Sequence, residues 1–312
     1  MAEIAIQVEN LAKTFGRGGR AVTALDGVTL NVAQGEIYGL LGRNGAGKTT
    51  LVKILLDIVR PTAGQARLRG IDARRPSARA RIGYLPEDHR FPDYRTGEGV
   101  LHYYAGLSAM SSAQRKTRVP ELLKLTGLSD AAHRKVRTYS KGMKQRLGLA
   151  QALVHDPQVV LLDEPTDGVD PVGRAQIRDV LRQLKERGTT IFLNSHLLSE
   201  VERICDRAAI IEKGRLVREG TLAALTSGGS VYTLNTSAPL DEQTRAALLE
   251  IAHSVTDSDG GYQLDLRCDE DVDRVVDLLR ARKIGIRGLT SKRLSLEEVF
   301  LQVVDTRAGE SG

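Results

Sequence analysis

One stretch decides the fold, and it reads Gly42-Arg43-Asn44-Gly45-Ala46-Gly47-Lys48-Thr49. The apolar run Ile37–Leu41 precedes it, and apolar residues recur at helical spacing over 51–58. A strand, a glycine-rich turn and a helix in this order surround an anion with backbone N–H groups and the positive end of the helix. The pattern therefore predicts a phosphate-binding loop.

The residues of this loop have expected roles. Lys48 would place a full charge on the β- and γ-phosphates and act as a catalytic residue, and Thr49 would offer its hydroxyl to Mg²⁺. A glycine turn without a ligand is the alternative, and the flanking strand and helix argue against it. The expected nucleotide contacts are Gly42, Arg43, Asn44, Gly45, Ala46, Gly47, Lys48, Thr49 and Thr50.

A second apolar run ends in two carboxylates. Val159–Leu162 is continuously apolar, as in a strand buried on both faces of a parallel sheet, and Asp163-Glu164 follows it directly. Because α/β folds bind ligands beyond the carboxyl ends of their strands, both acids are expected near the phosphates. Asp163 would hold Mg²⁺, and Glu164 would be the general base. Without the phosphate loop, the pattern would fit an ordinary strand and charged turn equally well.

The first 225 residues alternate strands and helices, which predicts a parallel α/β layer. A helix is expected over about 172–187, and a mostly helical insertion over about 95–155. Lys213-Gly214 predicts a hairpin. The expected strands are 4–8, 28–32, 37–41, 159–162, 190–194, 208–212 and 215–219.

A second domain is expected over residues 229–305, after a linker at Thr226–Gly229. It is predicted as a small α+β sandwich, with ferredoxin-like topology as one option. It shows no catalytic cluster, so a docking or regulatory role is expected, and 306–312 would be a flexible tail. The predicted elements are strands 231–236, 262–268 and 285–290, and helices 241–252, 270–282 and 295–304.

Composition narrows the possible classes of protein. The chain has 312 residues, 41% hydrophobic and 27% charged, which is ordinary for a globular protein of two domains. No apolar run approaches the roughly 18 residues of a membrane helix, and no secretory signal precedes the first strand. The net charge of +6 suits nucleotide phosphates, an anionic membrane face or nucleic acid without choosing among them. Cys205 and Cys268 are each expected to be buried free thiols.

A third stretch carries a family resemblance. Tyr139-Ser140-Lys141-Gly142-Met143 resembles the signature sequence of the ATP-binding subunits of ABC transporters, usually Leu-Ser-Gly-Gly-Gln. Ser140 and Gly142 match, whereas the other three residues depart. This variant and the segment 294–301 look like those of drug- and polysaccharide-efflux exporters. The resemblance covers residues 4–225 closely.

The resemblance implies an α/β P-loop NTPase (RecA-like) cassette with an N-terminal antiparallel β subdomain and a helical subdomain. Ser140 and Gly142 would bind the γ-phosphate held by a second cassette in a head-to-tail dimer. Asp170 would lie in the loop that crosses that interface. His196 resembles the catalytic switch histidine on the γ-phosphate, and Phe15 resembles the aromatic residue that stacks on adenine.

One residue departs from the family pattern in a way that bears on the chemistry. The family usually has Gln where this chain has Glu87, at a position that contacts Mg²⁺ and the attacking water. A carboxylate could still bind Mg²⁺, but it adds negative charge near the γ-phosphate.

The leading interpretation is a transport ATPase with ATP and Mg²⁺ as cofactors. Its expected partners are a second cassette and a separate transmembrane permease, at the cytoplasmic face of the membrane, with no nucleic acid. The runner-up is a soluble ABC ATPase acting on another macromolecule. A nucleotide sensor without turnover would be expected to lack Glu164 or His196, and both are present. The transported substrate cannot be inferred.

Overall fold

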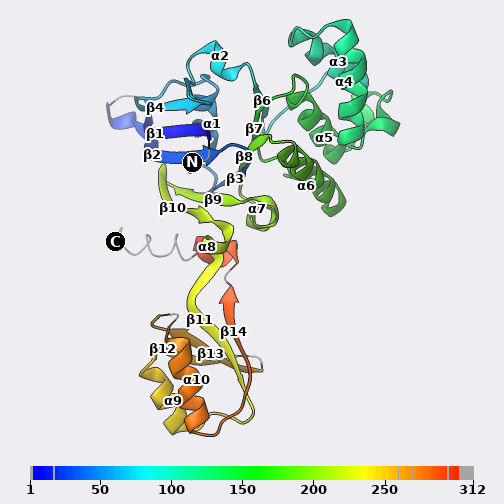
Figure 1. Ribbon diagram of the computed structural model, residues 1–312. Helices are drawn as coiled ribbons and strands as arrows, with labels where there is room; N and C mark the ends of the chain where they lie inside the picture. Colours follow the sequence, from blue (N-terminus) through cyan, green and yellow to red (C-terminus); the bar gives the residue numbers. More distant parts are fainter. Residues whose placement is uncertain (1–2, 17, 259, 269, 294, 302–312) are drawn as a thin grey trace. The chain divides into compact units, whose positions relative to one another are not determined.

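The computed structural model describes residues 3–16, 18–258, 260–268, 270–293 and 295–301. The chain divides into two compact units, Met1–Leu222 and Ala223–Gly312 (Figure 1). The first unit contains two sheets and the second contains one.

The first sheet is antiparallel and has the strand order β2-β1-β4-β5. Strands β1 and β2 are longer than predicted, because they stay paired with each other well past the predicted ends. The last paired residues of the β1–β2 hairpin are Phe15 and Val22. The strands are β1 (Ile4–Phe15), β2 (Val22–Ala33), β4 (Ala63–Leu68) and β5 (Ile71–Asp72).

The second sheet has the order β10-β9-β3-β8-β7-β6, in which all neighbours are parallel except β9 and β10. The β9–β10 hairpin turns at Lys213-Gly214, as predicted, with both residues at positive φ. Because β3, β6, β7 and β8 run in the same direction, their carboxyl ends meet at one edge. The strands are β3 (Ile37–Leu41), β6 (Ile82–Leu85), β7 (Val159–Asp163), β8 (Thr190–Ser195), β9 (Arg207–Glu212) and β10 (Arg215–Thr221).

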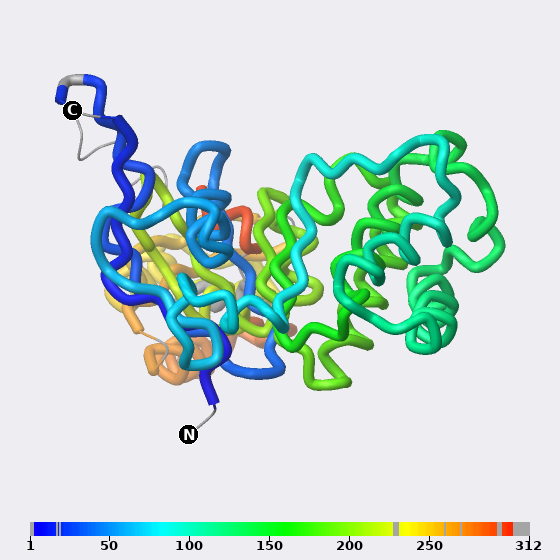
Figure 2. Tube along the Cα trace, turned by 90° about the horizontal axis from the view of Figure 1, so that it is seen from above, coloured from blue at the N-terminus to red at the C-terminus, as the bar shows by residue number. Residues whose placement is uncertain are grey.

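Helices cover and extend this sheet. Helix α1 (Lys48–Leu55) follows β3, α6 (Pro171–Glu186) joins β7 to β8, and α7 (Leu198–Ile204) joins β8 to β9. The segment predicted as a helical insertion contains three α-helices, which Figure 2 shows in cyan and green to one side of the N-terminal strands. They are α3 (Gly97–Leu107), α4 (Ser112–Leu125) and α5 (Lys141–Ala152).

The core of the first unit joins its two sheets through α1. Leu51 and Leu55 of α1 are fully buried beside apolar side chains from β1 and β2 and from β3 and β7. Tyr38 of β3 and Phe192 of β8 stack with ring centroids 5.7 Å apart. The backbone of β3 is therefore held from both faces and by both neighbouring strands, so the loop that follows β3 starts from a rigid base.

The second unit has the order β-α-β-β-α-β and an antiparallel sheet, β12-β13-β11-β14. This is the split β-α-β topology of ferredoxin-like domains. Its apolar core includes Leu234, Leu248, Leu264 and Leu279. Helix α8 (Leu222–Thr226) precedes the sheet. The other elements are β11 (Ser227–Thr236), α9 (Glu242–Leu249), β12 (Ala252–Ser258), β13 (Gly261–Leu266), α10 (Asp271–Ala281) and β14 (Ile286–Arg293).

Two predictions for this region were wrong, and one strand was missed. Residues 227–229 are not a linker but the start of β11. Strand β12 was missed, because its edge position leaves it with mostly polar side chains and no apolar alternation to recognise. Cys268 is exposed, whereas Cys205 is buried as expected. Residues 296–301 are helical and Ser295 precedes the helix, whereas residues 302–304 of the predicted helix and the predicted tail 306–312 lie outside the described residues.

Within the described part of the chain, no helix combines the length and apolarity needed to cross a lipid bilayer.

Candidate functional site

The predicted phosphate loop lies between β3 and α1, at the edge where the parallel strands end. Gly45 and Gly47 have φ of 83° and 112°, which side chains other than glycine rarely adopt. A Cβ at Gly47 would also collide with the carbonyl oxygen of Ala24 in β2. Gly47 therefore allows the loop to turn into α1 while it packs against the first sheet.

Lys48 is buried at the start of α1, with 6% of its surface exposed. Its Nζ donates to the carbonyl oxygen of Gly42 at 2.6 Å and to that of Arg43 at 3.3 Å. It also lies 3.9 Å from Oε1 of Glu164. Burial lowers the pKa of Lys48, and the negative charges of Glu164, Asp163 and Glu87 oppose that shift. The ammonium thus stands where a phosphate could replace the carbonyl oxygens that it now contacts.

A cavity of about 280 Å³ opens beside Lys48, and it brings together residues from four parts of the chain. Its walls come from the phosphate loop, the start of α1, the segment after β6 and the end of β7. The lining residues are Arg43, Asn44, Gly45, Gly47, Lys48, Thr49, Thr50, Glu87, Asp163 and Glu164. A polar, cation-bearing cavity of this kind accepts a polyanion such as a nucleotide triphosphate.

Asp163 is the last residue of β7 and is buried. Burial raises its pKa, while hydrogen bonds from Asn194 and Thr49 act in the opposite direction. The Asn194 Nδ2 lies 3.4 Å from Oδ1 of Asp163. The carboxylate therefore has two polar neighbours, one of which, Thr49, is another predicted metal ligand.

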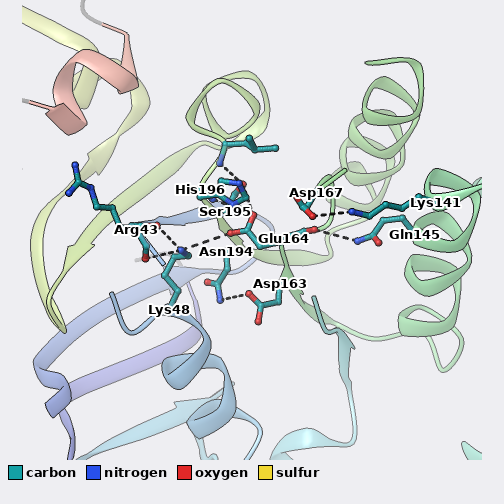
Figure 3. A network of polar contacts seen from close by, with 12 residues as sticks. Arg43, Lys48, Lys141, Gln145, Asp163, Glu164, Asp167, Asn194, Ser195 and His196 are labelled. Carbon is teal, nitrogen blue, oxygen red and sulfur yellow. Dashed lines mark hydrogen bonds and ion pairs between the residues drawn. The ribbon is translucent and has the colours of Figure 1, made fainter. Parts of the chain in front are cut away.

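Glu164 has an unusual backbone and a crowded carboxylate (Figure 3). Its φ of 49° lies in the left-handed region, which is uncommon for a residue with a side chain. Its Oε2 accepts hydrogen bonds from Ser195 Oγ and from the backbone N–H of His196, both at 3.3 Å. Nδ1 of His196 lies 2.9 Å from the same oxygen. Gln145 of α5 donates to the carbonyl oxygen of Glu164 at 3.4 Å.

The remaining predicted site residues do not line this cavity. Ser140 is exposed and caps α5, where its Oγ accepts from the N–H of Met143 at 3.2 Å. Asp170 caps α6 in the same way, through the N–H of Gly173. Phe15 is 42% exposed, with the ammonium of Lys13 4.8 Å from its ring centroid. The others outside the lining are Gly42, Ala46, Gly142 and His196.

Three polar residues that surround the predicted acids were not predicted as site residues. Asn194 and Ser195 end β8 and bind Asp163 and Glu164, and Gln145 reaches Glu164 from α5. The sequence could have indicated Asn194 and Ser195, because polar residues at the end of a buried strand repeat the pattern seen at Asp163-Glu164. In the described part of the chain, no group of three or more His, Cys, Asp or Glu residues forms a metal centre.

The geometry agrees with comparisons to known proteins. The ABC transporter family model matches residues 25–167, which include the phosphate loop, α5 and both acids. An ABC transporter ATP-binding protein of Nostoc is 41% identical over 304 residues, covering 96% of this chain and 89% of that protein. The chain belongs to the ABC transporter ATP-binding proteins. The cassette is therefore an ATP-binding, ATP-hydrolysing transport subunit, and the runner-up interpretation is not supported.

Two further relatives and one solved structure are also similar to this chain. The daunorubicin resistance ATP-binding protein DrrA3 of Streptomyces coeruleorubidus is 36% identical over the whole of both chains. The Nod factor export ATP-binding protein I of Paraburkholderia xenovorans is 45% identical, covering 72% of this chain and 73% of that protein. The dimeric cassette MJ0796 bound to ADP and Pi has a TM-score of 0.64 at 27% identity, covering 70% of this chain and 98% of that one.

Proposed function

We propose that the cassette hydrolyses ATP at the cavity beside Lys48, with Glu164 as general base, and that this drives export through a separate permease. The observation that supports this most directly is the position of the Glu164 carboxylate. It lines the same cavity as Lys48, 3.9 Å from its ammonium, and is oriented by Ser195 and His196.

The reaction breaks the bond between the γ-phosphorus and the bridging oxygen, and a water oxygen takes its place. Glu164 accepts the proton of that water, and His196, 2.9 Å from the same carboxylate, orients the base. Lys48 exchanges the carbonyl oxygens of Gly42 and Arg43 for phosphate oxygens, where its charge offsets the negative charge of the transition state.

The donor set fits Mg²⁺, which favours hard oxygen ligands. The Thr49 hydroxyl and the Asp163 carboxylate would hold the ion, and both line the same cavity as Glu87. The metal, when bound, would neutralise charge on the phosphates. Glu87 would contribute a negative charge where the family usually has a neutral amide.

The site is proposed to be completed by a second cassette. Ser140 and Gly142, at the N-terminus of α5, do not line the cavity with Lys48, and Ser140 is exposed. A helix N-terminus with an exposed hydroxyl can bind an anion presented by another molecule. The dimeric form of MJ0796 supports this arrangement. Asp170 would lie at the interface, and Phe15 would stack on adenine.

The proposed direction of transport is export, because relatives such as the Nod factor and daunorubicin proteins are named for export and resistance. The proposal places the cassette at the cytoplasmic face of the membrane, bound to its permease. Within the chain, we propose a cassette over 1–225, with a helical subdomain at about 95–155, and an accessory domain over 229–305.

The decisive experiment replaces the base. Glu164→Gln in the full chain should lower ATP turnover by about 100-fold or more while ATP affinity is kept. The control is Glu186→Gln, at the exposed last residue of α6, which should hydrolyse ATP at the normal rate. The slow variant should also form dimers with ATP in size-exclusion chromatography and retain a multi-helix membrane protein from solubilised membranes. Turnover close to normal would remove Glu164 from the base role.

A further inference from the structure

The signature segment of this chain has a lysine where the family pattern has glycine, and the structure gives that lysine a partner. Lys141 is the first residue of α5, and its Nζ lies 3.1 Å from Oδ2 of Asp167. Asp167 belongs to the loop 164–170 between β7 and α6, which Figure 3 shows facing α5. An ion pair therefore joins the first residue of α5 to the loop that begins with Glu164.

The side chain of Lys141 lies along this loop, although most of it remains exposed to solvent. Gly168 has a φ of 60°, and a Cβ built there would overlap Nζ and Cε of Lys141. The positive φ favours glycine at position 168, and the overlap shows how closely the lysine side chain approaches the loop backbone. One residue further along α5, a Cβ at Gly142 would lie 3.3 Å from Cγ1 of Val169. The helix N-terminus and the loop are in close contact at both positions.

A third contact reaches the proposed base itself. Gln145, one helical turn after Lys141, donates to the carbonyl oxygen of Glu164 at 3.4 Å. The backbone of Glu164 is in the left-handed region, and such a conformation persists only when its surroundings hold it. Helix α5 therefore contacts both the residue that begins this loop and the residues in its middle.

We propose that Lys141 is a positioning residue for hydrolysis: its ion pair with Asp167 fixes the loop 164–170 against α5 and so keeps the Glu164 carboxylate in place. The inference rests on the proposed role of Glu164 as base. Glycine at this position has no side chain, so the family's usual signature cannot form this contact. Because Lys141 and Asp167 are both substantially exposed, the pair is weak and is screened by salt.

The first test separates catalysis from binding. In the full chain, Lys141→Ala and Asp167→Ala should each lower kcat by about two- to fivefold with KM unchanged, and the double variant should be no slower than either single variant. Lys141→Arg should restore the rate, because it can form the same pair. A matched control is Arg182→Ala, which breaks an exposed pair with Asp179 at 3.0 Å on α6 and should leave kcat unchanged.

The second test measures hydrogen exchange in the loop 164–170 in the absence of ATP turnover. In the nucleotide-free Lys141→Ala protein, amide hydrogens of residues 166–170 should exchange about two- to fivefold faster than in the unmodified protein or the Arg182→Ala control. Unchanged kcat and exchange would overturn the inference, as would a raised KM with normal kcat, which would mean direct contact with nucleotide. If Glu164→Gln is slow but Lys141→Ala is normal, only this inference fails; if Glu164→Gln is itself normal, the proposed function fails.

Discussion

Gly47 offers a sharp test of how the phosphate loop is built, because Gly45 provides a matched control two residues away. Both residues have positive φ, but only at Gly47 would a Cβ collide with the Ala24 carbonyl oxygen; at Gly45 nothing lies within 4 Å. An alanine at Gly45 should cost about 1 kcal/mol for its backbone conformation. At Gly47 the conformation is less favourable and the overlap must be relieved, so the cost should be about 3 kcal/mol.

These costs translate into melting temperatures. For a unit of this size, 1 kcal/mol corresponds to a shift of about 2–4 °C, so Gly47→Ala should melt about 6–12 °C lower and Gly45→Ala only about 2–4 °C lower. Circular dichroism on the nucleotide-free full chain measures both shifts. The comparison must be made without nucleotide, because Gly45 also lines the cavity. Equal shifts for the two variants would refute the proposed packing of Gly47 against β2.

Two further predictions concern charge. Lys48→Ala should abolish tight ATP binding, because it removes the buried cation of the cavity; unchanged affinity for a fluorescent ATP analogue would undo the phosphate-loop assignment. Burial lowers the pKa of His155, which is hydrogen-bonded to the Ile82 carbonyl oxygen. The folded protein therefore favours neutral His155. The free energy of unfolding that this preference supports is fully present above the unfolded pKa of about 6.5, and it is lost as pH falls below that value. His155→Gln should therefore lose less stability than the unmodified protein between about pH 7.5 and 5.5 in urea unfolding; equal losses would contradict the assignment.

The central strands β3, β7 and β8 of the second sheet could be predicted because burial on both faces leaves a continuous apolar run, whereas β6 was not predicted. Ile37–Leu41 is entirely buried, and its predicted bounds are those of β3. The helix predicted over 172–187 is α6, whose start is marked by the capping Asp170 followed by a proline. These elements can be predicted from local sequence, because a continuous apolar run and a helix cap are both visible without information about distant residues.

The parts that were missed depend on contacts between distant residues. No local pattern indicates that His196 lies 2.9 Å from Glu164, or that Asn194 orients Asp163, because both contacts arise only when β7 and β8 pair. The lysine in the signature was recognised as a departure, but its partner Asp167 could not be identified from spacing. The exposure of Cys268 likewise depends on how the second unit packs.

The central position of β3 has a consequence for how the protein is made. Its neighbours are β8, paired as Ile37 with Ile191, and β9, paired as Tyr38 with Arg207. The strand that precedes the phosphate loop therefore cannot pair until residues more than 150 positions later have been synthesised. Pairing over such separations is slow. A nascent chain that ends before β8 would leave β3 unpaired and its apolar residues exposed, so the phosphate loop would not be held in its binding conformation. Nucleotide binding by this cassette should thus begin only late in translation.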